Sequence, residues 1–121
     1  MNKYRNTEKD IHKRIYWFIV RCFKDVVKKI PKTAENLPII NQISSSLTSI
    51  GANDQEADAA SSRKDFIAKY HIVKKETKET LYWLTFIKDS QILESNIVTS
   101  CGKECHEILL IVSSILNSAK Y

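Results

Sequence analysis

The sequence contains very little glycine and proline. Two residues of each type occur among 121, whereas 43% of the residues are hydrophobic. Glycine and proline mark the turns between short strands, so their scarcity argues against a domain with many strands. The composition instead favours a few long helices, and the length suits one domain with a substantial core.

Long hydrophobic runs are also missing. No stretch of about 18 apolar residues is present to cross a bilayer. We expect no secretory signal peptide, because the first ten residues, MNKYRNTEKD, are polar. Only three cysteines occur, Cys22, Cys101 and Cys105, and we expect them to be reduced thiols in a cytoplasmic protein.

The common catalytic motifs are absent. The sequence has no glycine-rich phosphate loop, no serine elbow motif and no zincin motif. A di-iron helical bundle needs Glu-x-x-His pairs, and no glutamate here has a histidine three residues later. Glu76 and Glu79 alternate with lysines, which is typical of a solvated, ion-paired helix face. We therefore expect a protein that is not an enzyme.

The cysteines and histidines offer two weaker sites. Cys101, Cys105 and His106 have a spacing that could present zinc ligands, but both cysteines fall on an apolar stripe and no second close pair completes a shell. Cys22 with His71 could form a nucleophilic pair, but the period turns Cys22 inward and His71 off the stripe. We expect no metal and no cofactor.

Hydrophobic residues recur at helical spacing along four segments. Short polar connections separate them, so we predict an all-α fold, an antiparallel up-down-up-down four-helix bundle formed by a single domain of residues 1–121. The predicted helices cover residues of about 9–30, 38–58, 62–88 and 93–119.

The same periodicity predicts the packing. Pro31 should end the first helix, Ser62 should cap the third, and Gly51 should lie at a close contact between helices. The residues expected to face the interior are Ile43, Leu47, Phe66, Tyr70, Leu81, Leu84, Ile108 and Val112.

Positive charge is concentrated at one end of the chain. The formal net charge is +5, and residues 1–33 hold ten Lys or Arg against three Asp or Glu. A helical wheel places several of these cations with a tryptophan on the outer face of the first helix. We interpret it as a solvated face with the tryptophan in a subunit interface; the alternative is that it binds the phosphates of RNA or DNA. A membrane surface is disfavoured, because the bundle needs this helix. The residues of this face are Lys13, Arg14, Trp17, Arg21, Lys24 and Lys28.

A second group of aromatic residues lies near the C-terminal end of the predicted third helix. Tyr82, Trp83 and Phe86 lie within five residues, and such groups pack in a core or an interface. Trp83 lies off the main stripe, so we predict that these residues, together with Trp17, form a subunit interface.

An ordered series of short motifs runs through the chain. It comprises Gln42, residues 48–53 (TSIGAN), 56–57 (EA), 64–67 (KDFI) and 79–84 (ETLYWL), with 113–115 (SSI) and 118–120 (SAK) at the end. This series resembles the small bacterial four-helix-bundle family whose first members are encoded within intervening sequences of large-subunit ribosomal RNA genes. The resemblance covers residues of about 10–120.

The resemblance implies a ring-like homopentamer. A related branch is the accessory protein of diversity-generating retroelements, a basic pentamer that engages nucleic acid and a reverse transcriptase. This chain departs from the pattern at Ser45, where an arginine is usual, and at Asp54, where an aromatic residue is frequent. We therefore expect a homo-oligomeric binding or assembly module, whose partners are itself and another protein, or alternatively RNA or DNA.

Overall fold

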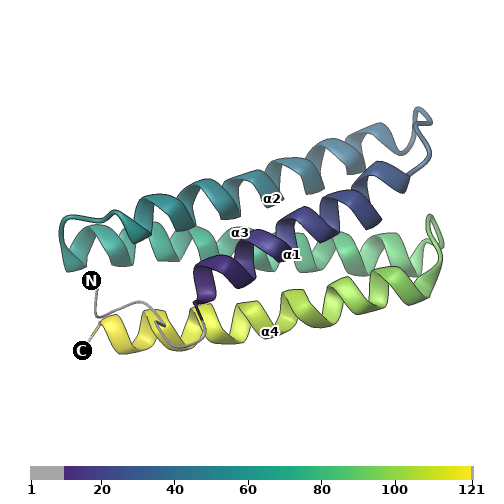
Figure 1. Cartoon of the computed structure of the whole chain (residues 1–121). Coiled ribbons are helices and arrows are strands. Elements are labelled where there is room, and N and C mark those ends of the chain that lie inside the picture. Colours follow the sequence, from purple (N-terminus) through teal and green to yellow (C-terminus); the bar gives the residue numbers. More distant parts are fainter. Residues whose placement is uncertain (1–9, 121) are drawn as a thin grey trace.

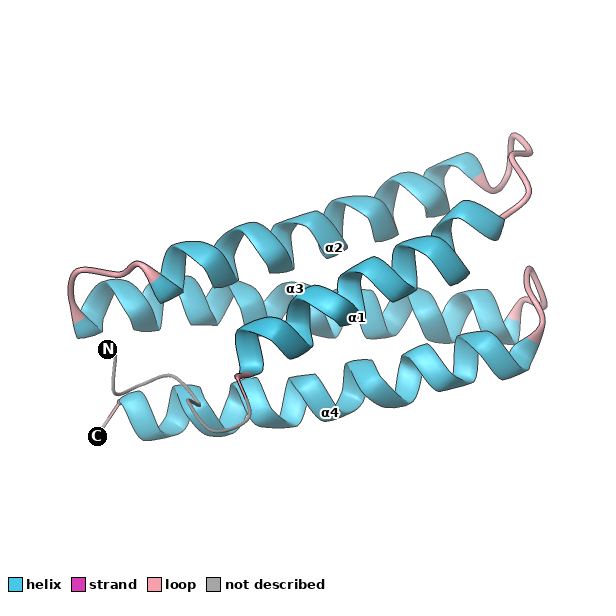
Figure 2. Cartoon of the chain, viewed as in Figure 1, coloured by secondary structure: helices cyan, strands magenta, loops and turns pink. Residues whose placement is uncertain are grey.

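Four helices run alternately up and down to form one bundle. The computed structural model describes residues 10–120, and it contains α1 (Ile11–Asp25), the short 3₁₀ helix η1 (Val27–Lys29), α2 (Leu37–Asp58), α3 (Arg63–Asp89) and α4 (Ser95–Ala119). Figure 1 shows the four long helices side by side with reversed directions, and Figure 2 shows no strand among the described residues. The all-α, up-down-up-down prediction is confirmed.

In cross-section the four helices lie at the corners of a square. α2 and α4 each pack against both α1 and α3, whereas the backbones of α1 and α3 do not contact each other. α1 and α3 are therefore diagonal to each other, and their outer surfaces lie on opposite sides of the bundle. α1 is also the shortest of the four, and in Figure 1 it crosses in front of α3, between α2 and α4.

The core runs along the whole bundle. Of the eight residues predicted to face inward, seven are buried at 0–1% exposure, and Leu81 packs against the core while remaining partly exposed. The largest buried side chains are Tyr70 and Phe66, whose rings stack with centroids 4.6 Å apart. Burial of this apolar surface is the main force that holds the four helices together.

The prediction of a first helix over residues 9–30 is wrong at its C-terminal end, and residue 9 lies outside the described residues. α1 stops at Asp25, and η1 follows after Val26. Val26, Val27 and Ile30 are all buried, whereas consecutive residues of an α-helix point about 100° apart. The tighter 3₁₀ turn aligns residues three apart, which brings Val27 and Ile30 onto one buried face. Ile30, before Pro31, is extended.

Local contacts fix the start of α3 and the approach of α1 to α2. The Ser62 side chain accepts a hydrogen bond from the Asp65 amide (3.1 Å) and caps α3 as predicted. The Arg63 side chain donates to the carbonyl of Ala119, which ties the start of α3 to the end of α4. At Gly51 a Cβ atom would lie 3.1 Å from Cδ1 of Ile19 on α1, so the predicted close helix contact is present.

Candidate interaction surfaces

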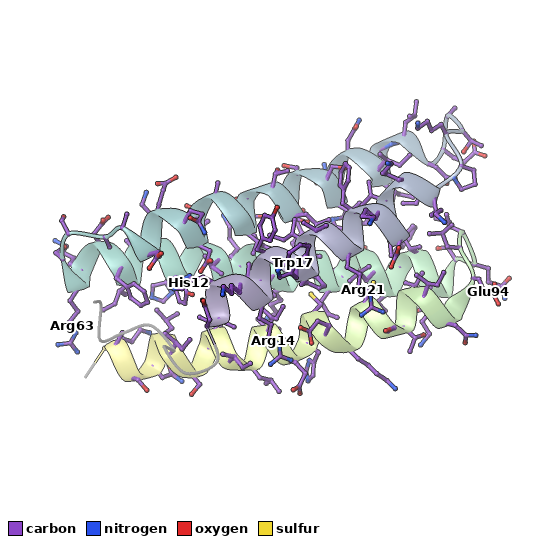
Figure 3. The ribbon with its side chains drawn as sticks, viewed as in Figure 1. His12, Arg14, Trp17, Arg21, Arg63 and Glu94 are labelled. Atoms are coloured by element: carbon purple, nitrogen blue, oxygen red, sulfur yellow. The ribbon has the colours of Figure 1, made fainter. Side chains whose placement is uncertain are left out.

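The predicted basic face lies on the outer side of α1, but its cations are not equivalent. Lys13, Lys24 and Lys28 are exposed, and none of them forms an ion pair with another described residue. Figure 3 shows Trp17 and Arg21 projecting from the same helix. The lysines therefore remain available for a partner, whereas the two arginines contact α4 as described next.

Arg14 forms an ion pair within the chain, with Glu104 of α4. Its Nε and one terminal nitrogen both donate to the Glu104 carboxylate of α4 at 2.8 Å, a bidentate geometry. The hydrogen bond to Glu104 raises the pKa of Arg14. The helical wheel placed Arg14 on the outer face, but the residue is only half-exposed and lies between α1 and α4 (Figure 3). Arg14 thus joins the two helices.

Arg21 is exposed but also has partners within the chain. A terminal nitrogen donates to Oγ of Ser100 on α4 at 2.7 Å, and Nε lies 3.7 Å from a carboxylate oxygen of Asp25 one turn later. An exposed pair of this kind contributes little to stability. Its charge is nevertheless partly neutralised, so the lysines dominate the positive potential of α1.

Tyr16 and Trp17 are the two most exposed aromatic residues of α1. Trp17 is 63% exposed and Tyr16 is 55% exposed. Their rings pack edge to face with centroids 5.2 Å apart. We call this pair the α1 patch. Large aromatic surfaces left in water are costly for an isolated domain and are frequent at protein interfaces.

The second aromatic group occupies the outer side of α3. Tyr82 is 58% exposed, Phe86 is 38% exposed and Trp83 is partly buried against the core. The Trp83 indole nitrogen donates to Glu79 at 3.2 Å, and the three rings contact one another with centroids 4.9–6.5 Å apart. We call this group the α3 patch. Because α1 and α3 are diagonal, the two patches face opposite sides of the bundle.

A buried polar cluster, which the sequence did not predict, joins three helices. Asp54 of α2 is 1% exposed; each of its carboxylate oxygens lies 2.8 Å from Nδ1 of His12, and one accepts a hydrogen bond from the Tyr70 hydroxyl at 2.7 Å. An ionised carboxylate can only accept, so Nδ1 of His12 carries a hydrogen. His12 Nε2 lies 3.7 Å from Asp58. The cluster connects α1, α2 and α3 through charge-assisted hydrogen bonds.

Two signals could have revealed this cluster. His12 lies between Ile11 and Ile15 on the apolar stripe of α1, and Asp54 follows Ile50 by four residues on the seam of α2. A histidine and a carboxylate on the buried stripes of neighbouring helices suggest a mutual contact, because an unpaired buried charge is too costly.

The three cysteines lie inside the bundle. Cys22, Cys101 and Cys105 are free thiols with 0–1% exposure. Hydrogen bonding with Cys101 and burial both raise the pKa of Cys22, and burial raises the pKa of Cys105 to about 12. His106 and His71 are exposed while the cysteines are buried. Among residues 10–120 no three His, Cys, Asp or Glu side chains are grouped so that they could hold a metal ion. The thiols act here as small core side chains.

The fold and its surfaces define a small helical bundle with two exposed aromatic patches. Residues 7–114 match the family described as 23S rRNA-intervening sequence protein. A crystal structure from Bacteroides thetaiotaomicron, a protein of unknown function from the S23 ribosomal protein family, is 33% identical; the match covers 88% of this chain and 97% of that chain with a TM-score of 0.74. No curated protein matches the chain in sequence.

The chain therefore belongs to the family of 23S rRNA-intervening sequence proteins. The predicted resemblance is confirmed. No helix within residues 10–120 is both long enough and apolar enough to span a membrane.

Proposed function

We propose that this protein is a non-enzymatic module that assembles with copies of itself and presents the assembled surface to a partner. The observation that supports the proposal is the exposure of two aromatic patches, with Trp17 at 63% and Tyr82 at 58%. Tryptophan and tyrosine are the residues most enriched among those that dominate binding energy at interfaces.

The positions of the patches favour a head-to-tail assembly. The α1 patch and the α3 patch lie on opposite sides of the bundle, so the α1 patch of one copy can contact the α3 patch of the next. Repeated contacts of this kind form a ring when the rotation between copies closes. The pentamer that the family resemblance implies is a closed ring of this type. Three reduced thiols are consistent with a cytoplasmic location.

The test is the mass of the protein in solution. We expect the wild-type protein to sediment as an oligomer, and Trp17→Ala or Tyr82→Ala to lower the mass, because truncating an interface anchor costs about 2–4 kcal/mol of binding. Lys64→Gln, a change of an exposed α3 residue outside both patches, should leave the mass unchanged. A monomeric wild-type protein, or an unchanged mass in both aromatic variants, would contradict the proposal.

A second function, binding of RNA or DNA, is favoured by the lysines of α1. Lys13, Lys24 and Lys28 are exposed without a described acidic partner, and a ring would repeat them once per subunit. The logarithm of the affinity falls as the logarithm of the salt concentration rises, and phosphate contacts by two lysines should make this fall steeper by about 2.

The nucleic-acid function makes a separate prediction. Lys24→Gln with Lys28→Gln should weaken binding to any sequence and flatten that salt slope, while the matched pair Lys64→Gln with Lys78→Gln on α3 should not. Equal losses in both pairs would point to the net charge of the chain rather than to the α1 face.

A further inference from the structure

The two glycines of this chain lie inside helices for different reasons. Gly51 is explained by the chain itself, because a Cβ atom there would lie 3.1 Å from Ile19. A Cβ atom at Gly102, on α4, would meet no atom within 4 Å. Glycine in a helix interior is less favourable than alanine, and nothing within residues 10–120 uses the space that Gly102 leaves open.

That space belongs to a groove between α3 and α4. The groove has a volume of about 670 Å³ and is lined by the apolar side chains of Leu81, Leu84 and Val98 together with Gly102. The two helices are held in register by a hydrogen bond from Cys105 to the Thr77 carbonyl at 3.4 Å. Pockets for small molecules in proteins have volumes of about 300–1,000 Å³ and mostly apolar walls, so the groove has the size and character of a binding site.

The rim of the groove is positively charged. Lys88 and Lys103 supply this charge, with Glu107 as the one acidic lining residue. Neither lysine is paired with a carboxylate among the described residues, whereas Glu107 lies 3.8 Å from Arg14 on the α1 side. The uncompensated charge at the rim is therefore positive.

We propose that this groove binds a small amphiphilic anion, that is, an elongated apolar molecule with one carboxylate or phosphate head. The apolar body lies along Leu81 and approaches the α4 backbone closely at Gly102, above the buried side chains of Leu84 and Val98. The head group meets Lys88 or Lys103. Leu81 and Lys88 are seven residues apart on one helix, which gives the body a length of about 10 Å. The site is separate from both aromatic patches.

Decanoate is a suitable probe, since it combines an alkyl chain with one carboxylate. In calorimetric titrations we expect saturable binding of decanoate and no binding of decylamine, which carries the opposite charge. Gly102→Leu should fill the groove without a backbone clash and weaken binding at least tenfold. Lys88→Gln with Lys103→Gln should also weaken it at least tenfold. Lys64→Gln with Lys78→Gln, two exposed residues of α3 outside the groove, should change it less than twofold.

Three results would overturn the proposal. The first is decanoate binding that Gly102→Leu leaves unchanged in a variant that keeps the wild-type circular dichroism spectrum. The second is equal binding of decanoate and decylamine, which indicates a nonspecific apolar surface. The third is no decanoate binding together with a lower sedimentation mass of Gly102→Leu, which would assign the groove to a second copy of the chain. Gly102→Ala, with its smaller added volume, tests the groove if the leucine variant does not fold.

Discussion

Removal of the Asp54 carboxylate should be among the most destabilising single changes in this protein. Asp54→Ala removes the partner of His12 Nδ1 and of the Tyr70 hydroxyl, which lie 2.8 Å and 2.7 Å from its oxygens. His12 and Tyr70 are 6% and 0% exposed, so both groups are largely shielded from water in the folded protein. Each of these two groups loses a hydrogen bond to the carboxylate while it stays buried, which costs about 1.5–3 kcal/mol per group. We expect a loss of about 3–5 kcal/mol.

The measurement is urea unfolding followed by circular dichroism at a fixed protein concentration, since an oligomer's apparent stability depends on that concentration. Tyr70→Phe keeps the ring that stacks on Phe66 and removes only the hydroxyl, so it should cost about 1.5–3 kcal/mol. In the Tyr70→Phe background, Asp54→Ala should lower the free energy of unfolding by about 1 kcal/mol less than in the wild type, because there is no hydroxyl left to lose its hydrogen-bond partner.

A surface acid of the same helix provides the control. Glu56 is exposed and pairs with Lys69 at 2.8 Å, so Glu56→Ala should cost no more than about 1 kcal/mol. A cost below about 1 kcal/mol for Asp54→Ala, or the same cost in both Tyr70 backgrounds, would refute the description of the cluster as a buried, mutually dependent network.

Other changes test the packing and the thiols. Leu84 is 1% exposed, so Leu84→Ala should lower the free energy of unfolding by about 2–5 kcal/mol, and a loss below about 0.5 kcal/mol would show a surface position. Gly102→Ala should raise the free energy of unfolding by about 1 kcal/mol, whereas Gly51→Leu should lower it, because its side chain meets Ile19; the opposite order in denaturant melts would contradict the contact. Burial raises the pKa of Cys105 from 9.0 to about 12, so the unfolded chain releases this proton first, and the stability that Cys105 contributes below pH 9 should be lost as the pH rises to about 12. Cys105→Ala should flatten that part of the stability profile, and an unchanged slope would contradict the burial of the thiol.

The helices could be predicted from the sequence because their apolar residues recur with one period. The end of α1 could not, since Val26 and Ile30, four residues apart, also continue the α-helical stripe of the first helix. Only the structure shows that Val26, Val27 and Ile30 are all buried in one core, which a 3₁₀ turn allows and a continuous α-helix does not. The cap at Ser62 and the contact at Gly51 were predictable because each depends on local chemistry or on side-chain size.

The sequence predicts which side chains point outward from the bundle, but it does not predict which residues they contact. A helical wheel gives the direction of Arg14, but it cannot show that Glu104, 90 residues later, holds it. The exposure of Trp17 followed from its position opposite the apolar stripe. Asp54 was noted only as a departure from the family pattern, and its role depends on His12 and Tyr70 from two other helices.

A mixing experiment tests the proposed head-to-tail assembly most directly. Trp17→Ala keeps an intact α3 patch and Tyr82→Ala keeps an intact α1 patch, so one functional contact can form between the two variants. Each variant alone should sediment near the mass of a single chain, 14.0 kDa. An equimolar mixture should form a species of two chains that does not grow further, because its outer patches are both defective. A mixture that stays monomeric, or variants that each keep the wild-type mass, would contradict assembly through these two patches.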